Sequence, residues 1–233
     1  MAWDKEYLSR ACYYLAGLAE RDPGGTWANR PSNSLKDILL PWLPHTVADF
    51  KERKIAIKAI RNDFPNVAWN LIIALWLNQY LISTGTYEPK WRNAILADWD
   101  KKITPAQYQQ ETLFYASLAI SLSENHLDRI IKVIENIDYL SEDLLDSFLN
   151  KIIISYFSDI DKRNIWEKLS EYFFQYQREQ SDTLSNEILE KLKEIIGMFQ
   201  PQDIQDQYRH LFTEYDYSLY EKPGGDWDEE QKS

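Results

Sequence analysis

The sequence predicts an all-α fold in which antiparallel helix pairs stack as a loose, HEAT-like α-solenoid. Hydrophobic residues make up 44% of the 233 residues and aromatic residues 14%, which is too apolar for a disordered chain. The seven glycines are fewer than a sheet protein with many tight turns requires. Apolar residues also recur at intervals of three and four, as they do on one face of a helix. A closed helical bundle satisfies the same observations and stays open as an alternative.

Residues 1–103 are expected to form a tryptophan-rich helical subdomain with ordered loops. The first helix is predicted over Trp3 to Glu20, because its apolar residues fall on one helical face. That face should pack against the helices that follow. Its apolar positions are Tyr7, Leu8, Ala11, Tyr14, Leu15 and Leu18.

A loop that begins with Gly24 and Gly25 should lead into a short apolar helix. Glycine tolerates backbone angles that are closed to other residues, so this loop is interpreted as a built structure. The short helix is predicted from Leu35 to Leu40, with Ser34 as its N-cap.

A longer helix is expected to start at Thr46 and to end at Phe64. Thr46 and Asp49 resemble a capping box with aspartate in place of glutamate, and Pro65 should stop the helix. The next helix, Val67 to Leu77, is apolar nearly all round, which predicts a central position covered on several sides. The irregular piece that follows, residues 78–103, is predicted to hold a short helix around 91–96.

Residues 104–220 are expected to form three helix hairpins. Their capped starts at Thr104, Ser141 and Ser185 lie 37 and 44 residues apart, the spacing of two-helix repeats, although no repeated sequence signature accompanies them. Residues 221–233 form a polar, acidic segment that is predicted to be a flexible tail. The predicted helices are 104–123 with 127–137, 141 onward with 165–180, and 185–199 with 202–212.

The charge is distributed unevenly along the chain. Residues 1–103 hold 14 Lys and Arg against 11 Asp and Glu, whereas residues 104–233 hold 12 against 26. An acidic half repels nucleic acid and suits a basic protein partner, and the mildly basic half leaves anion binding open. The N-terminus lacks a signal-peptide pattern, and the longest apolar run is too short to span a membrane, so a cytoplasmic protein is expected.

The sequence holds no recognisable catalytic, metal or cofactor motif. The single cysteine, Cys12, cannot form an internal disulfide, and the three histidines lie far apart and are expected to be caps or surface residues. The acids at Asp159 and Asp161 superficially resemble a calcium loop, but Asn164 stands where that loop needs glycine. Helix capping explains these acids better. We therefore expect a protein that is not an enzyme and needs no cofactor.

Two groups of residues could contact a ligand or partner. Seven of the nine tryptophans precede Thr104, and they are interpreted as a large aromatic core in preference to a platform that stacks sugars or bases. Trp27 and Trp91, in loops, are the expected exceptions. Basic side chains on the longer helix could touch phosphates or an acidic sister domain, but such a stripe is more often only solvated. The candidate contact residues are Trp27, Arg30, Lys51, Lys54, Lys58, Arg61, Trp91, Tyr215, Tyr217 and Tyr220.

Five segments carry a resemblance to one family. They read GGTWANRPSNSL, ILLPWLPHT, PNVAW, TGTYEPKWR and LFTEYDYSLYE, and together they extend over nearly the whole chain. They resemble a helical-repeat segment of large bacterial and cyanobacterial multidomain proteins with a STAND-type ATP-binding module, many of them suspected of antiviral defence. The resemblance implies a segment that follows an ATP-binding module. Because the ATP-binding motif is absent here, a fragment of such a protein is expected.

The leading hypothesis is a non-enzymatic intracellular scaffold that binds a protein partner or adjacent domains of a larger assembly. Nucleic acid is a possible but less favoured partner, and no membrane association is expected. The alternative is an acidic regulator that mimics nucleic acid and blocks a basic partner.

Overall fold

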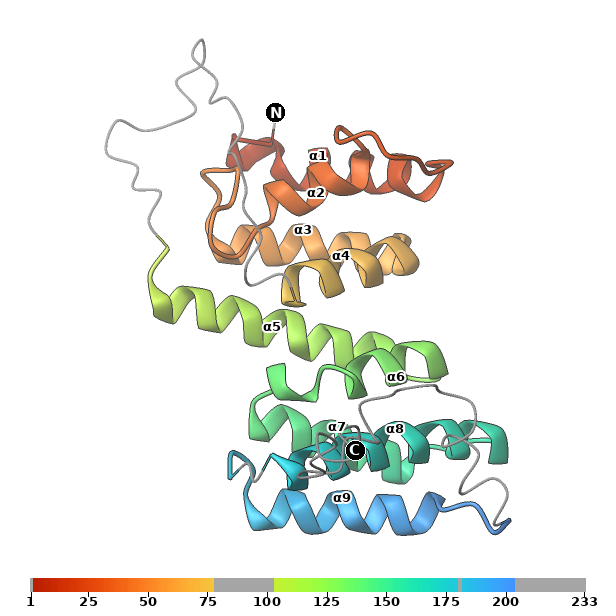
Figure 1. Ribbon diagram of the computed structural model, residues 1–233. Helices are drawn as coiled ribbons and strands as arrows, with labels where there is room; N and C mark the ends of the chain where they lie inside the picture. Colours follow the sequence, from red (N-terminus) through yellow and green to blue (C-terminus); the bar gives the residue numbers. More distant parts are fainter. Residues whose placement is uncertain (1, 78–102, 180–181, 204–233) are drawn as a thin grey trace, which may run out of the picture.

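The computed structural model describes residues 2–77, 103–179 and 182–203, and within these ranges the chain is helical without strands (Figure 1). This confirms the predicted all-α class. The α-helices are α1 (Lys5–Glu20), α2 (Pro31–Ile38), α3 (Phe50–Asp63), α4 (Pro65–Leu77), α5 (Pro105–Ser123), α6 (Leu127–Ile134), α7 (Glu142–Ile154), α8 (Asp159–Arg178) and α9 (Asn186–Phe199), and a 3₁₀ turn, η1 (Ile137–Tyr139), follows α6.

The helices succeed one another along a stack, from α1 and α2 at one end to α9 at the other (Figure 1). Helix α1 packs on α2 and α3, α4 packs on α5, and α5 packs on α6 as the first predicted hairpin requires. The second predicted hairpin differs, because the closest packing of α7 and of α8 is with α9. The HEAT-like solenoid stays a prediction.

The four helix starts predicted before residue 78 all differ from the structure, those of α1 and α4 by two residues and those of α2 and α3 by more. Helix α2 begins at Pro31, so Ser34 lies inside the helix; proline suits a first position because its ring fixes φ and its missing N–H is not needed there. Helix α3 is capped by Asp49, three residues after Thr46, and Glu52 completes its capping box through two hydrogen bonds of 2.9 Å. The longer glutamate at the third position reaches the cap backbone, and this pairing decides the helix start.

The predicted caps of the C-terminal half are largely confirmed. Thr104 forms a capping box with Gln107, and Ser141 and Ser185 occupy the N-cap positions of α7 and α9. Helix α8 starts six residues earlier than predicted, because Ser158 and Asp161 form a capping box. The acids at the start of α8 therefore serve helix capping, as expected.

One continuous core of buried apolar side chains extends from α1 to α9. Helix α4 has the predicted covered position, with Ile72 and Trp76 fully buried. Helix α1 departs in part from its prediction, because Leu8 is buried as predicted but Cys12 and Ala16, outside the predicted face, complete its buried side. Three residues of its predicted inner face, Tyr7, Tyr14 and Leu18, are instead exposed. The helix carries apolar residues on two faces, and packing on α2, α3 and α4 selects one of them.

Candidate interaction surfaces

The loop between α1 and α2 has a fixed conformation that its own polar groups build. Asp22 accepts a hydrogen bond from the Gly24 N–H (3.2 Å) with one carboxylate oxygen and from Arg30 Nε (3.0 Å) with the other. The Arg30 guanidinium also donates to the carbonyl of Gly25 at 2.5 Å. Gly24 and Gly25 have φ of +94° and +132°, angles that favour glycine. The clamp between Asp22 and Arg30 thus closes the loop.

This clamped loop displays Trp27, whose side chain is 79% exposed. The exposure agrees with the expectation that Trp27 stands apart from the aromatic core. Arg30, also a predicted contact residue, uses its guanidinium to hold the loop. A large exposed indole on an ordered loop is a surface suited to burial against a partner.

The predicted basic stripe of α3 is divided between two environments. Lys51 and Lys58 are exposed to solvent. Lys54 lies over the Phe50 ring, 4.4 Å from its centroid, and also approaches Phe114 of α5. Arg61 donates a hydrogen bond to Ser121 Oγ of α5 at 3.0 Å. Two of the four cations therefore help to join α3 to α5, and the other two are exposed to solvent.

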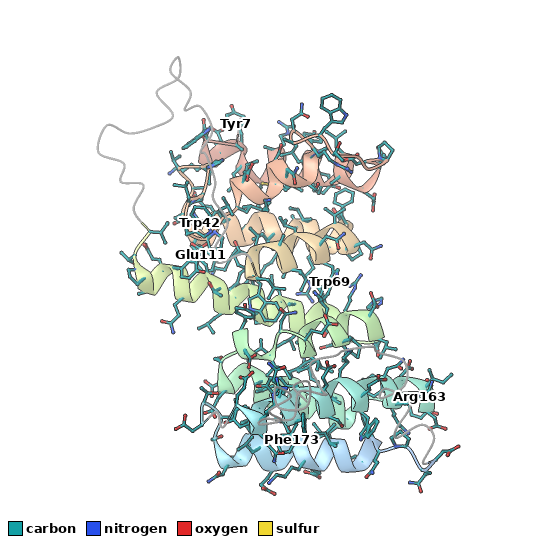
Figure 2. All side chains as sticks on the ribbon, in the orientation of Figure 1. Tyr7, Trp42, Trp69, Glu111, Arg163 and Phe173 are labelled. Atoms are coloured by element: carbon teal, nitrogen blue, oxygen red, sulfur yellow. The ribbon has the colours of Figure 1, made fainter. Side chains whose placement is uncertain are left out.

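A buried ion pair joins α3 to α5. The side chains of Arg53 and Glu111 are 3% and 1% exposed. Arg53 Nη2 donates a hydrogen bond to Glu111 Oε1. Arg53 also donates to the carbonyl of Ala48 at 2.9 Å. Glu111 projects from α5 at the level of the α2–α3 connection, where Trp42 lies (Figure 2). Burial raises the pKa of Glu111 to about 7, although the positive charge of Arg53 opposes the shift.

Further polar contacts join the N-terminal segment, before residue 78, to α5 and α6. The Tyr115 hydroxyl donates to the carbonyl of Leu39 at 3.2 Å, and burial raises its pKa. Arg129 of α6 donates to Asn66 Oδ1 of α4 at 2.7 Å and lies 5.1 Å from the centroid of the Trp69 ring. The boundary at residue 103 is therefore bridged by specific contacts, and whether residues 1–103 and 104–220 are separate domains stays a prediction.

A cavity of about 420 Å³ lies where η1, the start of α7 and the end of α8 meet. The Tyr172 hydroxyl donates to Asp138 Oδ1 at 3.0 Å, and burial together with the Asp138 charge raises the pKa of Tyr172. Glu142 accepts a hydrogen bond from the Ser185 N–H at 2.5 Å. Of the described residues that line the cavity, three are carboxylates and none is basic. Carboxylates and tyrosine rings favour a cationic group over an anionic one.

Two of the three histidines lie in the described ranges. His126 is the exposed N-cap residue of α6, as expected. His45 departs from the expectation, because it is buried and its ring stacks on Trp3 with centroids 6.3 Å apart. Burial lowers the pKa of His45. In the described ranges, no three metal-binding side chains gather at one point, and no helix is long and apolar enough to cross a membrane.

Four of the candidate contact residues lie outside the described residues, namely Trp91, Tyr215, Tyr217 and Tyr220. Comparisons with protein-family models, with curated proteins and with solved structures find no match to the chain.

Proposed function

We propose that the chain is a non-enzymatic intracellular scaffold that binds a protein partner through Trp27 and its loop. The observation that carries the proposal is the 79% exposed indole on a loop fixed by the Asp22–Arg30 pair. Tryptophan is among the residues that contribute most to binding energy when an interface buries them. Because the loop is already ordered, binding would cost little further conformational entropy.

The resemblance of the sequence to helical segments of STAND-type proteins supports a place for this scaffold in bacterial defence. In such an assembly the partner would be an adjacent domain or a second protein. The two exposed cations of α3, Lys51 and Lys58, are a secondary contact that suits an acidic surface on that partner. A cytoplasmic location belongs to the same proposal.

A photo-crosslinking experiment in living cells tests the role of the loop. Trp27 is replaced by the photoreactive amino acid benzoylphenylalanine, and the matched control carries it in place of Tyr156, an exposed aromatic residue (97%) that follows α7. The expected result is a discrete cross-linked protein for position 27 that position 156 does not give. Equal cross-linking at both positions, or none at position 27, contradicts the proposal.

A second measurement tests the proposal that the chain is not an enzyme. The purified chain is incubated with nucleotides and with nucleic acids, and turnover is followed for the wild type and for variants at Glu111, Asp138 and Glu179. We expect no turnover. Turnover that one of these variants abolishes would show that the chain is an enzyme.

Besides the acidic composition of residues 104–233, the acidic-regulator alternative has one structural observation in its favour, which is the cavity with three carboxylates, Asp138, Glu142 and Glu179. A basic side chain of a partner would meet negative charge there. Replacing Glu142 and Glu179 by glutamine should then weaken the capture of DNA-binding proteins from lysate, whereas replacing Trp27 should not. Capture that depends on Trp27 alone favours the scaffold.

A further inference from the structure

The outer side of α1 carries an apolar stripe that the described residues leave uncovered. Tyr7, Tyr14 and Leu18 are 37%, 60% and 58% exposed. They are seven and four residues apart, so they lie in one line along the helix, and Ala11 is next to that line. Figure 2 shows Tyr7 at the end of the stack that α1 forms. This arrangement gives one end of the stack an apolar surface.

The opposite end of the described stack has a different chemistry. Most outward positions of α9 are polar or charged, with Glu187, Glu190, Lys193 and Glu194 exposed, and Met198 near its end is the one large apolar side chain exposed on this helix. The terminal units of stacked helical proteins need polar outer faces to remain soluble. Helix α9 largely fits that requirement, whereas α1 presents three tyrosines (Tyr7, Tyr13 and Tyr14) and Leu18 to solvent. The α1 stripe is therefore a surface that a further helix could cover.

The α1 stripe is complementary to itself in an antiparallel arrangement. If two copies of α1 meet with their midpoints between residues 12 and 13, Tyr7 of each copy faces Leu18 of the other. Tyr14 of each copy then faces the small Ala11 of the other. A large side chain opposite a small one allows the two helices to approach closely.

The charges beside the stripe fit the same arrangement. Arg21 is exposed directly after the end of α1, and Glu6 is exposed in its first turn beside the N-cap residue Asp4. By helical spacing Glu6 and Arg21 lie on the same flank of the stripe. In an antiparallel dimer, Arg21 of one chain lies near Asp4 and Glu6 at the start of α1 in the other chain. Because the dimer has twofold symmetry, this contact occurs twice.

We propose that the occupant of the α1 stripe is a second copy of this chain, bound in an antiparallel α1-to-α1 contact. The occupant that fits is a second copy because shape and charge both match under one twofold axis. The contact lies on the face of α1, a surface distinct from the Trp27 indole, so it goes beyond the scaffold function and does not depend on it.

Sedimentation equilibrium of the full chain over a range of concentrations tests the dimer. We expect a species of twice the chain mass of 27.7 kDa. The variant Tyr14→Asp places a charge in the centre of the contact and should raise the dissociation constant by about 10-fold or more. The control is Phe174→Asp, which alters a residue with the matching exposure of 59% on α8 and should leave the dissociation constant unchanged.

A charge-reversal pair identifies the orientation of the contact. Arg21→Glu should weaken the dimer, and combining it with Glu6→Arg should restore the dimer, because the opposite charges are then exchanged between the two ends. Circular dichroism spectra show whether each variant keeps the helix content of the wild type. A wild type that stays monomeric, equal weakening by Phe174→Asp, or no restoration in the double variant overturns the proposal.

Discussion

Replacing Glu111 with leucine takes the carboxylate away from the Arg53 guanidinium, which is 3% exposed. Arginine cannot release its proton in a protein, so a positive charge would remain buried without a partner. Breaking a buried ion pair in this way costs about 3–5 kcal/mol of the free energy of unfolding. We therefore expect Glu111→Leu to lower the stability of the chain by an amount of that order.

The partner variants separate the charge effect from simple loss of contact. Arg53→Met leaves a buried carboxyl group that can take up a proton, so it should cost less than Glu111→Leu. The double variant removes both charges and should be more stable than Glu111→Leu alone by about 2 kcal/mol or more. Replacing both charges does not return full stability, because the carbonyl of Ala48 loses its hydrogen bond from Arg53.

Urea unfolding of the four proteins at pH 8, followed by far-ultraviolet circular dichroism, forms a double-mutant cycle. The exposed pair of Lys132 and Glu135 is the control, because its side chains are 46% and 40% exposed. Removing that pair should change the free energy of unfolding by about 1 kcal/mol or less. If Glu111→Leu costs no more than this control, the inference that the pair is buried and joins α3 to α5 is wrong.

Three further predictions concern pH, capping and thiol reactivity. Burial raises the pKa of Glu111 from 4.5 to about 7, so between these values the folded chain binds a proton that the unfolded chain has lost. The free energy of unfolding should therefore fall as pH rises through this window. The urea midpoint of Glu111→Gln should fall less over the same pH range than that of the wild type. Thr104→Ala removes a capping box and should cost about 1 kcal/mol in urea unfolding, whereas Thr104→Ser should be nearly neutral. Burial raises the pKa of Cys12 to about 12, so dithionitrobenzoate should react with it rapidly at pH 8 only after urea unfolding; rapid reaction of the folded chain would contradict this.

The all-α class and most helix starts could be predicted, because the residue patterns that cause them are local in the sequence. The capping box of Thr104 and Gln107 depends on residues three positions apart, and the spacing of apolar residues is visible in any short window. Errors arose where two local signals competed. Thr46 and Asp49 both fit a cap of α3, and Glu52 decided between them by completing the box.

Contacts between distant residues could not be predicted from the sequence. The partner of Arg53 is 58 residues away and that of Arg129 is 63 residues away, and nothing in the spacing of charges indicates either pair. Lys54 and Arg61 were expected to belong to a surface stripe for the same reason. The apolar pattern of α1 suited two faces, and only the packing of the neighbouring helices shows which face is buried.

The exposed position of Trp27 was predictable from its loop, but the role of Arg30 was not. Glycines at 24 and 25 indicated a built turn, and a tryptophan in such a turn has no helical face to bury it. That Arg30 closes the loop on Asp22 depends on the three-dimensional course of the chain.

The most direct test of whether the clamped loop binds a partner is amide hydrogen exchange. It is measured for the chain alone and for the chain mixed with the partner protein that cross-linking at position 27 identifies. We expect the partner to slow exchange in the loop and the first turn of α2, residues 21–34, and to leave residues 127–139 unchanged. Slowing restricted to residues 127–139, with residues 21–34 unaffected, would contradict a scaffold that binds through Trp27.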